Sequence, residues 1–181
     1  MKKYLKNMAQ LILSPANGWE DIAAEQERPD EVARRGFFPL AALLGVSVLV
    51  SALYSRHVEA FHLVLQALIT GMSYFLSYFM GTFALSLFVE PLLEGRYDER
   101  RCQIFTLYIV GILAAIKIVI NCLPVSYDML FFVPLYVVLI EWKGATYLNV
   151  KPSRVGVFMI LAVFGVLVPP FLIDFLFSQL I

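Results

Sequence analysis

The side chains best suited to chemistry in this 181-residue sequence are ionisable groups that interrupt long apolar stretches. Lys117 lies deep in one such stretch, and Asp174 lies in another, just after Pro169 and Pro170. A charge inside a membrane-spanning helix is costly, so it pairs, reaches the membrane surface or lines a polar path. Lys117 can reach the surface with its long side chain, or it can pair with Asp174 at a similar depth. These residues form a candidate intramembrane polar site.

Glu141 is a further member of this candidate site. It lies two residues before Lys143, so the two side chains leave a helix on different faces and are not natural partners. We expect Glu141 to face another helix or a cytoplasmic cavity, in a structural rather than a catalytic role. Pro169 and Pro170 remove two main-chain donors, which predicts a kink or, alternatively, a helix broken at a binding site.

Patterns typical of enzyme active sites are missing from the sequence. It contains no glycine-rich phosphate loop, zinc-protease helix motif or serine elbow. His57 and His62, with Glu59 and Asp128, could form only a weak metal site, because their spacing fits no established ligand pattern. We therefore expect no enzymatic activity, and neither a metal ion nor another cofactor.

Composition indicates the class of protein that must position these side chains. Hydrophobic residues make up 60% of the chain and charged residues 15%, and the mean hydropathy is +0.78. A water-soluble domain of this length cannot bury so many apolar side chains, and a disordered chain needs the opposite composition. The 14 basic and 14 acidic residues balance, so no basic surface for nucleic acid is expected. The chain is expected to cross a membrane several times.

Five apolar segments approach the roughly 20 residues that a helix needs to cross a bilayer. They are residues 37–54, 61–93, 103–123, 127–148 and 155–181. Because open sheets leave main-chain groups unpaired in lipid, we expect an all-α bundle of five transmembrane helices. This domain (37–181) follows a cytoplasmic amphipathic segment (1–36). The fourth segment contains Pro134 and is purely apolar over few residues, so a re-entrant loop is the alternative to a full crossing.

Basic residues lie mostly on one side of these segments. Eleven Lys and Arg residues precede the first segment or lie between the second and third or the fourth and fifth, whereas the opposite loops contain only Arg56. Because basic loops stay in the cytoplasm, we expect a multi-pass inner-membrane protein with its amino terminus inside and its carboxyl terminus outside. Six arginines at the helix ends are candidates for binding anionic lipid headgroups. They are Arg34, Arg35, Arg96, Arg100, Arg101 and Arg154.

The amino-terminal segment has the pattern of an amphipathic helix flanked by lysines, which is typical of a helix on a membrane surface. The apolar face consists of Tyr4, Leu5, Met8, Leu11 and Ile12. A second short helix is expected to begin at Asn17, capped together with Glu20, and to anchor Trp19 at the membrane interface. A mobile polar tail is the alternative.

Small residues in the second apolar segment recur every fourth position. Ser73, Ser77 and Gly81 share one helical face, and helices in lipid associate through such residues. We expect this face to form a helix-packing seam, with Gly111 and Gly165 as candidate partners.

The sequence also resembles a known family. Leu11-Ile12-Leu13-Ser14-Pro15 followed by Trp19-Glu20-Asp21-Ile22-Ala23 is similar to the opening of bacterial Yip-one domain proteins. Phe38-Pro39-Leu40, Gly95-Arg96-Tyr97 and Trp142-Lys143-Gly144 are similar to later parts of that family. The resemblance implies a five-helix membrane protein with a cytoplasmic amino end. Eukaryotic members act in vesicle trafficking with Rab-type GTPases, but their Asp-Leu-Tyr-Gly-Pro motif is missing from this sequence, and the bacterial members have no settled activity.

The preferred interpretation is a non-enzymatic membrane protein that organises lipid or partner proteins, with itself or other membrane proteins as oligomeric partners. The alternative is a small transporter or channel with its site near Pro169-Pro170, Asp174 and Lys117. A transporter is expected to have a polar cavity that reaches the membrane midplane, with the charges facing it. A protein with a packing role is expected to have these charges paired or at the membrane surface.

Overall fold

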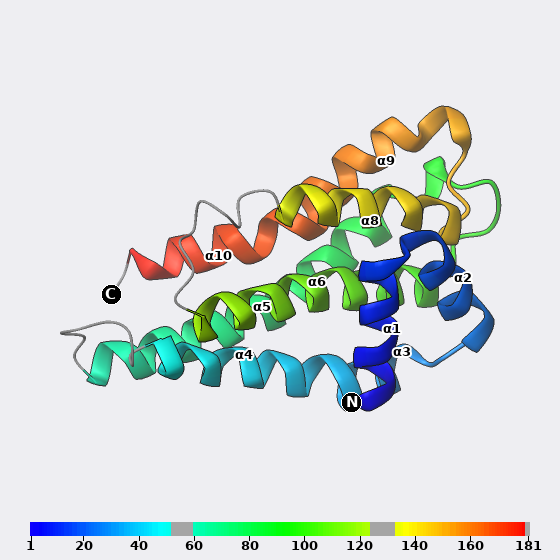
Figure 1. Cartoon of the computed structure of the whole chain (residues 1–181). Helices are drawn as coiled ribbons and strands as arrows, with labels where there is room; N and C mark the ends of the chain where they lie inside the picture. The colour runs from blue at the N-terminus through cyan, green and yellow to red at the C-terminus, as the bar shows by residue number, and fades with distance from the viewer. Residues whose placement is uncertain (52–59, 124–132, 180–181) are drawn as a thin grey trace.

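The computed structural model describes residues 1–51, 60–123 and 133–179, and every regular element in these ranges is a helix. The main helices are α1 (Lys2–Leu13), α2 (Pro15–Glu25), α3 (Pro29–Val32), α4 (Phe38–Ser51), α5 (Ala60–Phe88), α6 (Glu99–Cys122), α8 (Val133–Tyr147), α9 (Val155–Ala162) and α10 (Val168–Ser178). The long helices lie side by side, and α1 crosses them near one end (Figure 1).

Two of the long helices contain a turn of π-helix. Residues Ala33–Phe37 (η1) join α3 to α4, and residues Val163–Leu167 (η4) join α9 to α10. The first helix that is long and apolar enough to cross a membrane, Pro29–Val50, thus also includes residues before the expected apolar segment 37–54. It can begin at Pro29 because a proline in the first helical turn loses no hydrogen bond. A π turn inserts one extra residue and changes which side chains face the neighbouring helices afterwards.

Four helices in the described ranges are long and apolar enough to cross a membrane. They are Pro29–Val50, Ala60–Phe88, Glu99–Cys122 and Pro152–Phe177. The chain is thus an all-helical protein with the features of a multi-pass membrane protein. The expected fourth segment, 127–148, is described only from α8 onwards, and its first residues lie outside the described ranges.

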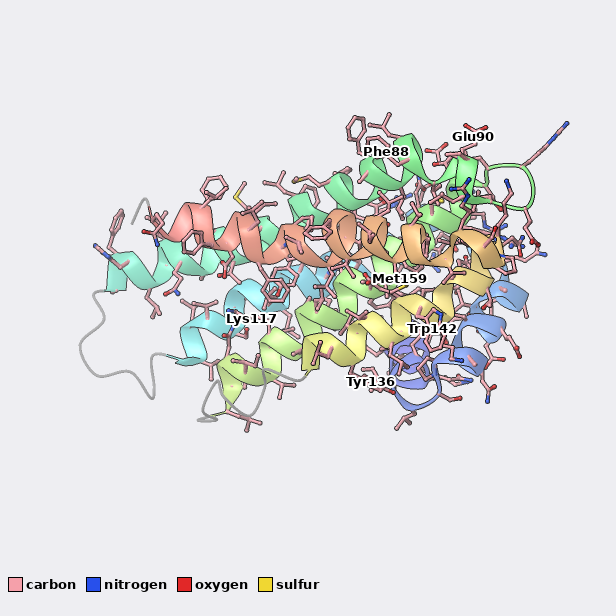
Figure 2. The ribbon with its side chains drawn as sticks, turned by 90° about the horizontal axis from the view of Figure 1, so that it is seen from above. Phe88, Glu90, Lys117, Tyr136, Trp142 and Met159 are labelled. Carbon is pink, nitrogen blue, oxygen red and sulfur yellow. The ribbon has the colours of Figure 1, made fainter. Side chains whose placement is uncertain are left out.

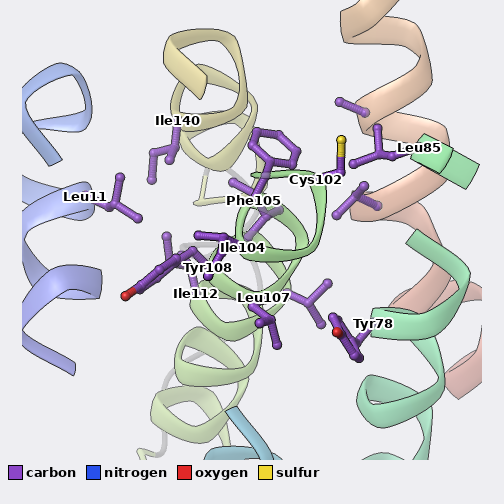
Figure 3. Packing of buried hydrophobic residues seen from close by; sticks show 14 of the residues in the cluster. Leu11, Tyr78, Leu85, Cys102, Ile104, Phe105, Leu107, Tyr108, Ile112 and Ile140 are labelled. Atoms are coloured by element: carbon purple, nitrogen blue, oxygen red, sulfur yellow. The ribbon is translucent and has the colours of Figure 1, made fainter. Parts of the chain in front are cut away.

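The core of the bundle is built around α6. Every residue of this helix from Ile104 to Ala114 is buried, and it contacts α4, α5 and α8. The helix begins cleanly because the Asp98 carboxylate accepts hydrogen bonds from the main-chain N–H groups of Arg100 (3.0 Å) and Arg101 (3.4 Å). Figure 3 shows side chains from the neighbouring helices meeting those of α6, with Leu11 of α1 among them.

The seam residues of α5 lie against two helices. A side-chain carbon added to Gly81 would lie 2.9 Å from the Thr106 methyl group and 3.3 Å from the carbonyl oxygen of Gly165. Ser73 and Ser77 are buried, and their hydroxyls donate to main-chain carbonyls four residues earlier. The small residues thus allow α5, α6 and the π turn of η4 to approach closely.

The amino-terminal helix α1 packs on protein through part of its apolar face. Tyr4, Met8 and Leu11 are buried, whereas Leu5 and Ile12 stay exposed. One face of α1 therefore contributes to the core, and a neighbouring apolar strip remains open to the surroundings.

Helix α2 differs from expectation in two respects. It begins at Pro15 after Ser14, so Asn17 lies inside the helix and is not its cap. Trp19 is only 1% exposed, and its indole N–H donates to the carbonyl oxygen of Ile140 at 3.0 Å. The expectation that Trp19 anchors the protein at the membrane interface is wrong, because a large aromatic ring finds its apolar surroundings within the protein core instead.

Candidate functional site

Lys117 and Asp174 form an ion pair between α6 and α10. The Lys117 Nζ lies 3.8 Å from Asp174 Oδ2, and the Thr70 hydroxyl of α5 donates to Asp174 Oδ1 at 3.3 Å. The two charged side chains are 26% and 29% exposed. Three helices therefore meet at one charged cluster, toward the end of the bundle opposite to Glu90 (Figure 2). Pairing lowers the cost of holding each charge at this depth.

A second polar contact lies one helical turn further along α6. The Asn121 side-chain amide donates to the Ser47 hydroxyl of α4 at 2.9 Å, and this hydroxyl donates to the carbonyl of Leu44 at 2.7 Å. Asn121 and Ser47 are both buried. Sequence reasoning missed these two residues and Thr70. The available signal was the spacing of four residues between Lys117 and Asn121, which places both on one face of α6.

The helix that contains Pro169 and Pro170 is continuous. Residues Pro152–Phe177 form one helical stretch, and the prolines lie in the first turn of α10, directly after the π turn of η4. Inside a continuous helix, the two prolines cannot donate to carbonyls of the preceding turn, and the wider π turn lies directly before them. Both prolines are buried. The structure therefore holds a local change of helical pitch at this point, and the helix is not broken.

Glu141 is fully buried on α8. Its exposed fraction is 0%, and within the described residues neither carboxylate oxygen has a hydrogen-bond partner. A buried, unpartnered carboxyl group opposes folding. Lys143 does not compensate it, because the Lys143 ammonium lies over the Trp142 ring, 5.0 Å from its centre. Of the candidate residues, Glu141 is the one whose buried charge no hydrogen bond among the described residues compensates.

The six arginines gather at one end of the bundle, which we call the basic end. Arg100 donates through Nε to the carbonyl of Glu27 at 2.9 Å, and so ties the amino-terminal segment to α6. Arg101 donates to the carbonyl of Tyr147 at 3.0 Å and lies 3.5 Å from Asp98 Oδ2. These two arginines hold neighbouring segments in place. The remaining four, Arg34, Arg35, Arg96 and Arg154, are exposed.

Two small cavities open beside these arginines. One, of about 150 Å³, is lined by Glu27, Arg100 and Tyr147, and the other, of about 280 Å³, by Arg96 and Tyr97. Both also include Asp98 and Arg101, which are already paired with each other. Burial raises the pKa of Tyr97 to about 12, so this phenol stays neutral at physiological pH. The cavities combine both signs of charge and show no catalytic arrangement.

The sequence offers one possible metal site, at His57, His62, Glu59 and Asp128. His57, Glu59 and Asp128 lie outside the described residues. Within residues 1–51, 60–123 and 133–179, no three histidine, cysteine or acidic side chains come together as a metal site would need. Cys102 and Cys122 are both free thiols.

Comparisons with known proteins identify no relative. No protein family, curated protein or solved structure matches the chain.

Proposed function

We propose that this chain is a non-enzymatic, five-span inner-membrane protein of the Yip-one type, which organises membrane lipid or partner proteins around a rigid helical bundle. The observation that carries the proposal is the ion pair between Lys117 and Asp174. A transporter needs its intramembrane charges available to a solute, whereas a packing role leaves them bound to each other.

Two features of the amino-terminal helix support a position at the membrane surface. Helix α1 crosses the long helices near the basic end instead of running parallel to them (Figure 1). Its exposed strip carries the apolar side chains of Leu5, Ile12 and Leu13 beside lysines of the same helix. Such a helix suits the cytoplasmic headgroup layer, with one face on protein and another on lipid. The positive-inside bias supports a cytoplasmic location for the basic end.

Helix α5 supplies the surface that we assign to lipid or partner proteins. It is 29 residues long and exposes a row of large apolar side chains along its length. These are Phe61, Val64, Leu68, Met72, Phe75, Leu76, Phe79, Met80, Phe83, Leu87 and Phe88. An apolar surface of this extent is stable only against hydrocarbon or another apolar protein surface.

Photocrosslinking in native membranes tests the organising role. A photoreactive phenylalanine analogue at the exposed position Phe83 is expected to capture one lipid class or one protein far above its share of the bulk membrane. Adducts that simply mirror the bulk composition would contradict the proposal.

A transport role remains the second candidate, because Thr70, Lys117 and Asp174 bring polar groups from three helices together. Neither Lys117 nor Asp174 lines the two cavities at the basic end. Neither of them lines a third hollow, an apolar groove between α4 and α5. Vesicles that contain the purified chain can be assayed for proton, sodium and potassium flux with ion-sensitive dyes. We expect the same flux from the wild type and from a Lys117→Met, Asp174→Asn double variant. Flux that the double variant lacks would establish the second candidate instead.

A further inference from the structure

An apolar groove runs between the antiparallel helices α4 and α5. Its volume is about 490 Å³, and apolar residues and glycines line it throughout. Phe38 and Phe75, with ring centres 5.3 Å apart, lie at its end nearest the basic end of the bundle, and Leu49 and Val64 lie at the other. In a bilayer, such a groove faces hydrocarbon.

The floor of the groove is formed by the close approach of two glycines. A side-chain carbon on Gly45 would lie 2.9 Å from the carbonyl oxygen of Ala67, and one on Gly71 would lie 3.7 Å from the Gly45 Cα. These glycines therefore form the contact between α4 and α5 and are not available for close packing with a further helix. The groove also has bulky exposed side chains, Leu68 and Met72 among them. A further helix would need small residues there to approach closely, so the groove suits a thinner occupant.

The dimensions of the groove match a single acyl chain. Phe38 and Leu49 are eleven residues apart in α4, which corresponds to roughly 16 Å along the helix axis. A groove of this length accommodates a large part of one extended acyl chain.

Positive charge lies next to the end of the groove at Phe38. Arg34 and Arg35 are in the π turn that directly precedes this residue, and both side chains are exposed. Neither forms an ion pair within the described part of the chain. Of the two carboxylates one turn earlier, Asp30 lies 3.7 Å from Arg28, and Glu31 is exposed. Residues 28–35 thus contain three arginines and two carboxylates.

We infer that the α4–α5 groove is a lipid-binding site for one acyl chain of an anionic phospholipid, whose phosphate is bound by Arg34 and Arg35. This inference rests on the proposed role in organising lipid and names the site and the lipid class. The apolar groove supplies chain burial, and the two arginines supply headgroup selectivity.

Native mass spectrometry of the delipidated full-length protein tests the site. The probes are dipalmitoyl phosphatidylglycerol, which is anionic, and dipalmitoyl phosphatidylcholine, which is not. Ala42→Phe fills the groove from an exposed position in its lining, and Leu43→Phe adds the same ring to the same helix outside it. We expect Ala42→Phe to weaken phosphatidylglycerol binding about tenfold, and Leu43→Phe to leave it unchanged.

The headgroup contact is tested separately. A double Arg34→Gln, Arg35→Gln variant is expected to bind phosphatidylglycerol roughly thirtyfold more weakly, at about fivefold per arginine, and to lose its preference over phosphatidylcholine. Arg154→Gln, at another corner of the basic end, serves as the control. Equal binding of both lipids by the wild type, or no effect of Ala42→Phe, would overturn the site. A wild-type dimer that Ala42→Phe dissociates would assign the groove to a second copy of the chain. Photoadducts at Phe83 are unaffected by failure of this site, so the proposed function is judged independently.

Discussion

The Tyr4 hydroxyl of α1 donates to the main-chain carbonyl of Leu107, at 2.6 Å and across 103 residues of sequence. The Tyr4 ring stacks on Tyr108, with ring centres 5.0 Å apart. Burial raises the pKa of the Tyr4 phenol well above its usual range, so it remains a hydrogen-bond donor at physiological pH. This contact joins the amino-terminal helix to the most buried helix of the bundle, and it depends on the space that Gly111 leaves.

Gly111→Ala is expected to loosen the docking of α1. The added carbon would lie 1.9 Å from the Tyr4 hydroxyl oxygen, and the helix has to move away to avoid it. We expect the free energy of unfolding to fall by about 1–3 kcal/mol, as for other overpacked cores. Thermal unfolding in detergent and limited proteolysis of residues 1–25 measure the effect. Gly156→Ala is the matched control, since nothing lies within 4 Å of the added carbon there.

Trp19→Ala is expected to destabilise the protein far more than Trp142→Ala. Trp19 is buried, stacks on Phe105 and Tyr147, and donates to Ile140, whereas Trp142 is exposed on α8. Loss of a fully buried Trp side chain costs about 3–5 kcal/mol. Denaturation midpoints of the two variants provide the comparison. Similar losses from both would show that α2 is not docked as described.

A double-mutant cycle measures the ion pair within the bundle. Asp174→Asn leaves Lys117 without its counter-ion, and Lys117→Met leaves Asp174 without its own. Each single variant is expected to be less stable than the wild type, and the double variant is expected to recover about 1–2 kcal/mol of the summed loss. Lys143→Met replaces Lys117→Met in a control cycle. Strict additivity in the first cycle would mean that the two charges do not interact in the folded protein.

Glu141→Met is expected to raise stability. The substitution replaces a buried carboxyl group that has no hydrogen-bond partner among the described residues with an apolar side chain of similar length. We expect a gain of about 1 kcal/mol or more in the free energy of unfolding, measured by denaturation in detergent. Glu90→Met, at an exposed position, is expected to have little effect. A loss of stability in Glu141→Met would reveal a structural partner of this carboxyl group.

Helix positions were largely accessible from composition, because membrane crossing imposes a simple local rule. Long apolar runs must be helical in lipid, and four of the five expected segments correspond to helices long enough to cross a membrane. Helix ends were less accessible. The helix that includes α4 starts at Pro29 and α5 ends at Phe88, because proline, turn and cap geometry decide the ends rather than hydropathy.

The partners of individual side chains needed three dimensions. Tryptophan is a residue type that often anchors proteins at the membrane interface, but Trp19 lies in the core. Its ring stacks on Phe105 and Tyr147, which come from other helices. Thr70 is a single hydroxyl in an apolar run, and nothing in that local pattern predicts its contact with Asp174, which is 104 residues away in the sequence. Glycines at positions 45, 71 and 111 look alike in sequence, and only their neighbours show which line a groove and which accommodate a ring.

Hydropathy and the distribution of charge were thus sufficient to indicate an all-helical membrane protein that has a few charged residues inside its apolar segments. Both properties can be read along the chain, since each residue contributes to them independently of its distant neighbours. The sequence left open whether Lys117 pairs with Asp174 and whether the helix breaks at Pro169 and Pro170, and the tertiary structure decided both points. The hollow between α4 and α5 came from the tertiary structure alone. All three features are properties of the packed bundle. They depend on the rotation and spacing of helices that are remote in sequence, which packing sets and local composition does not.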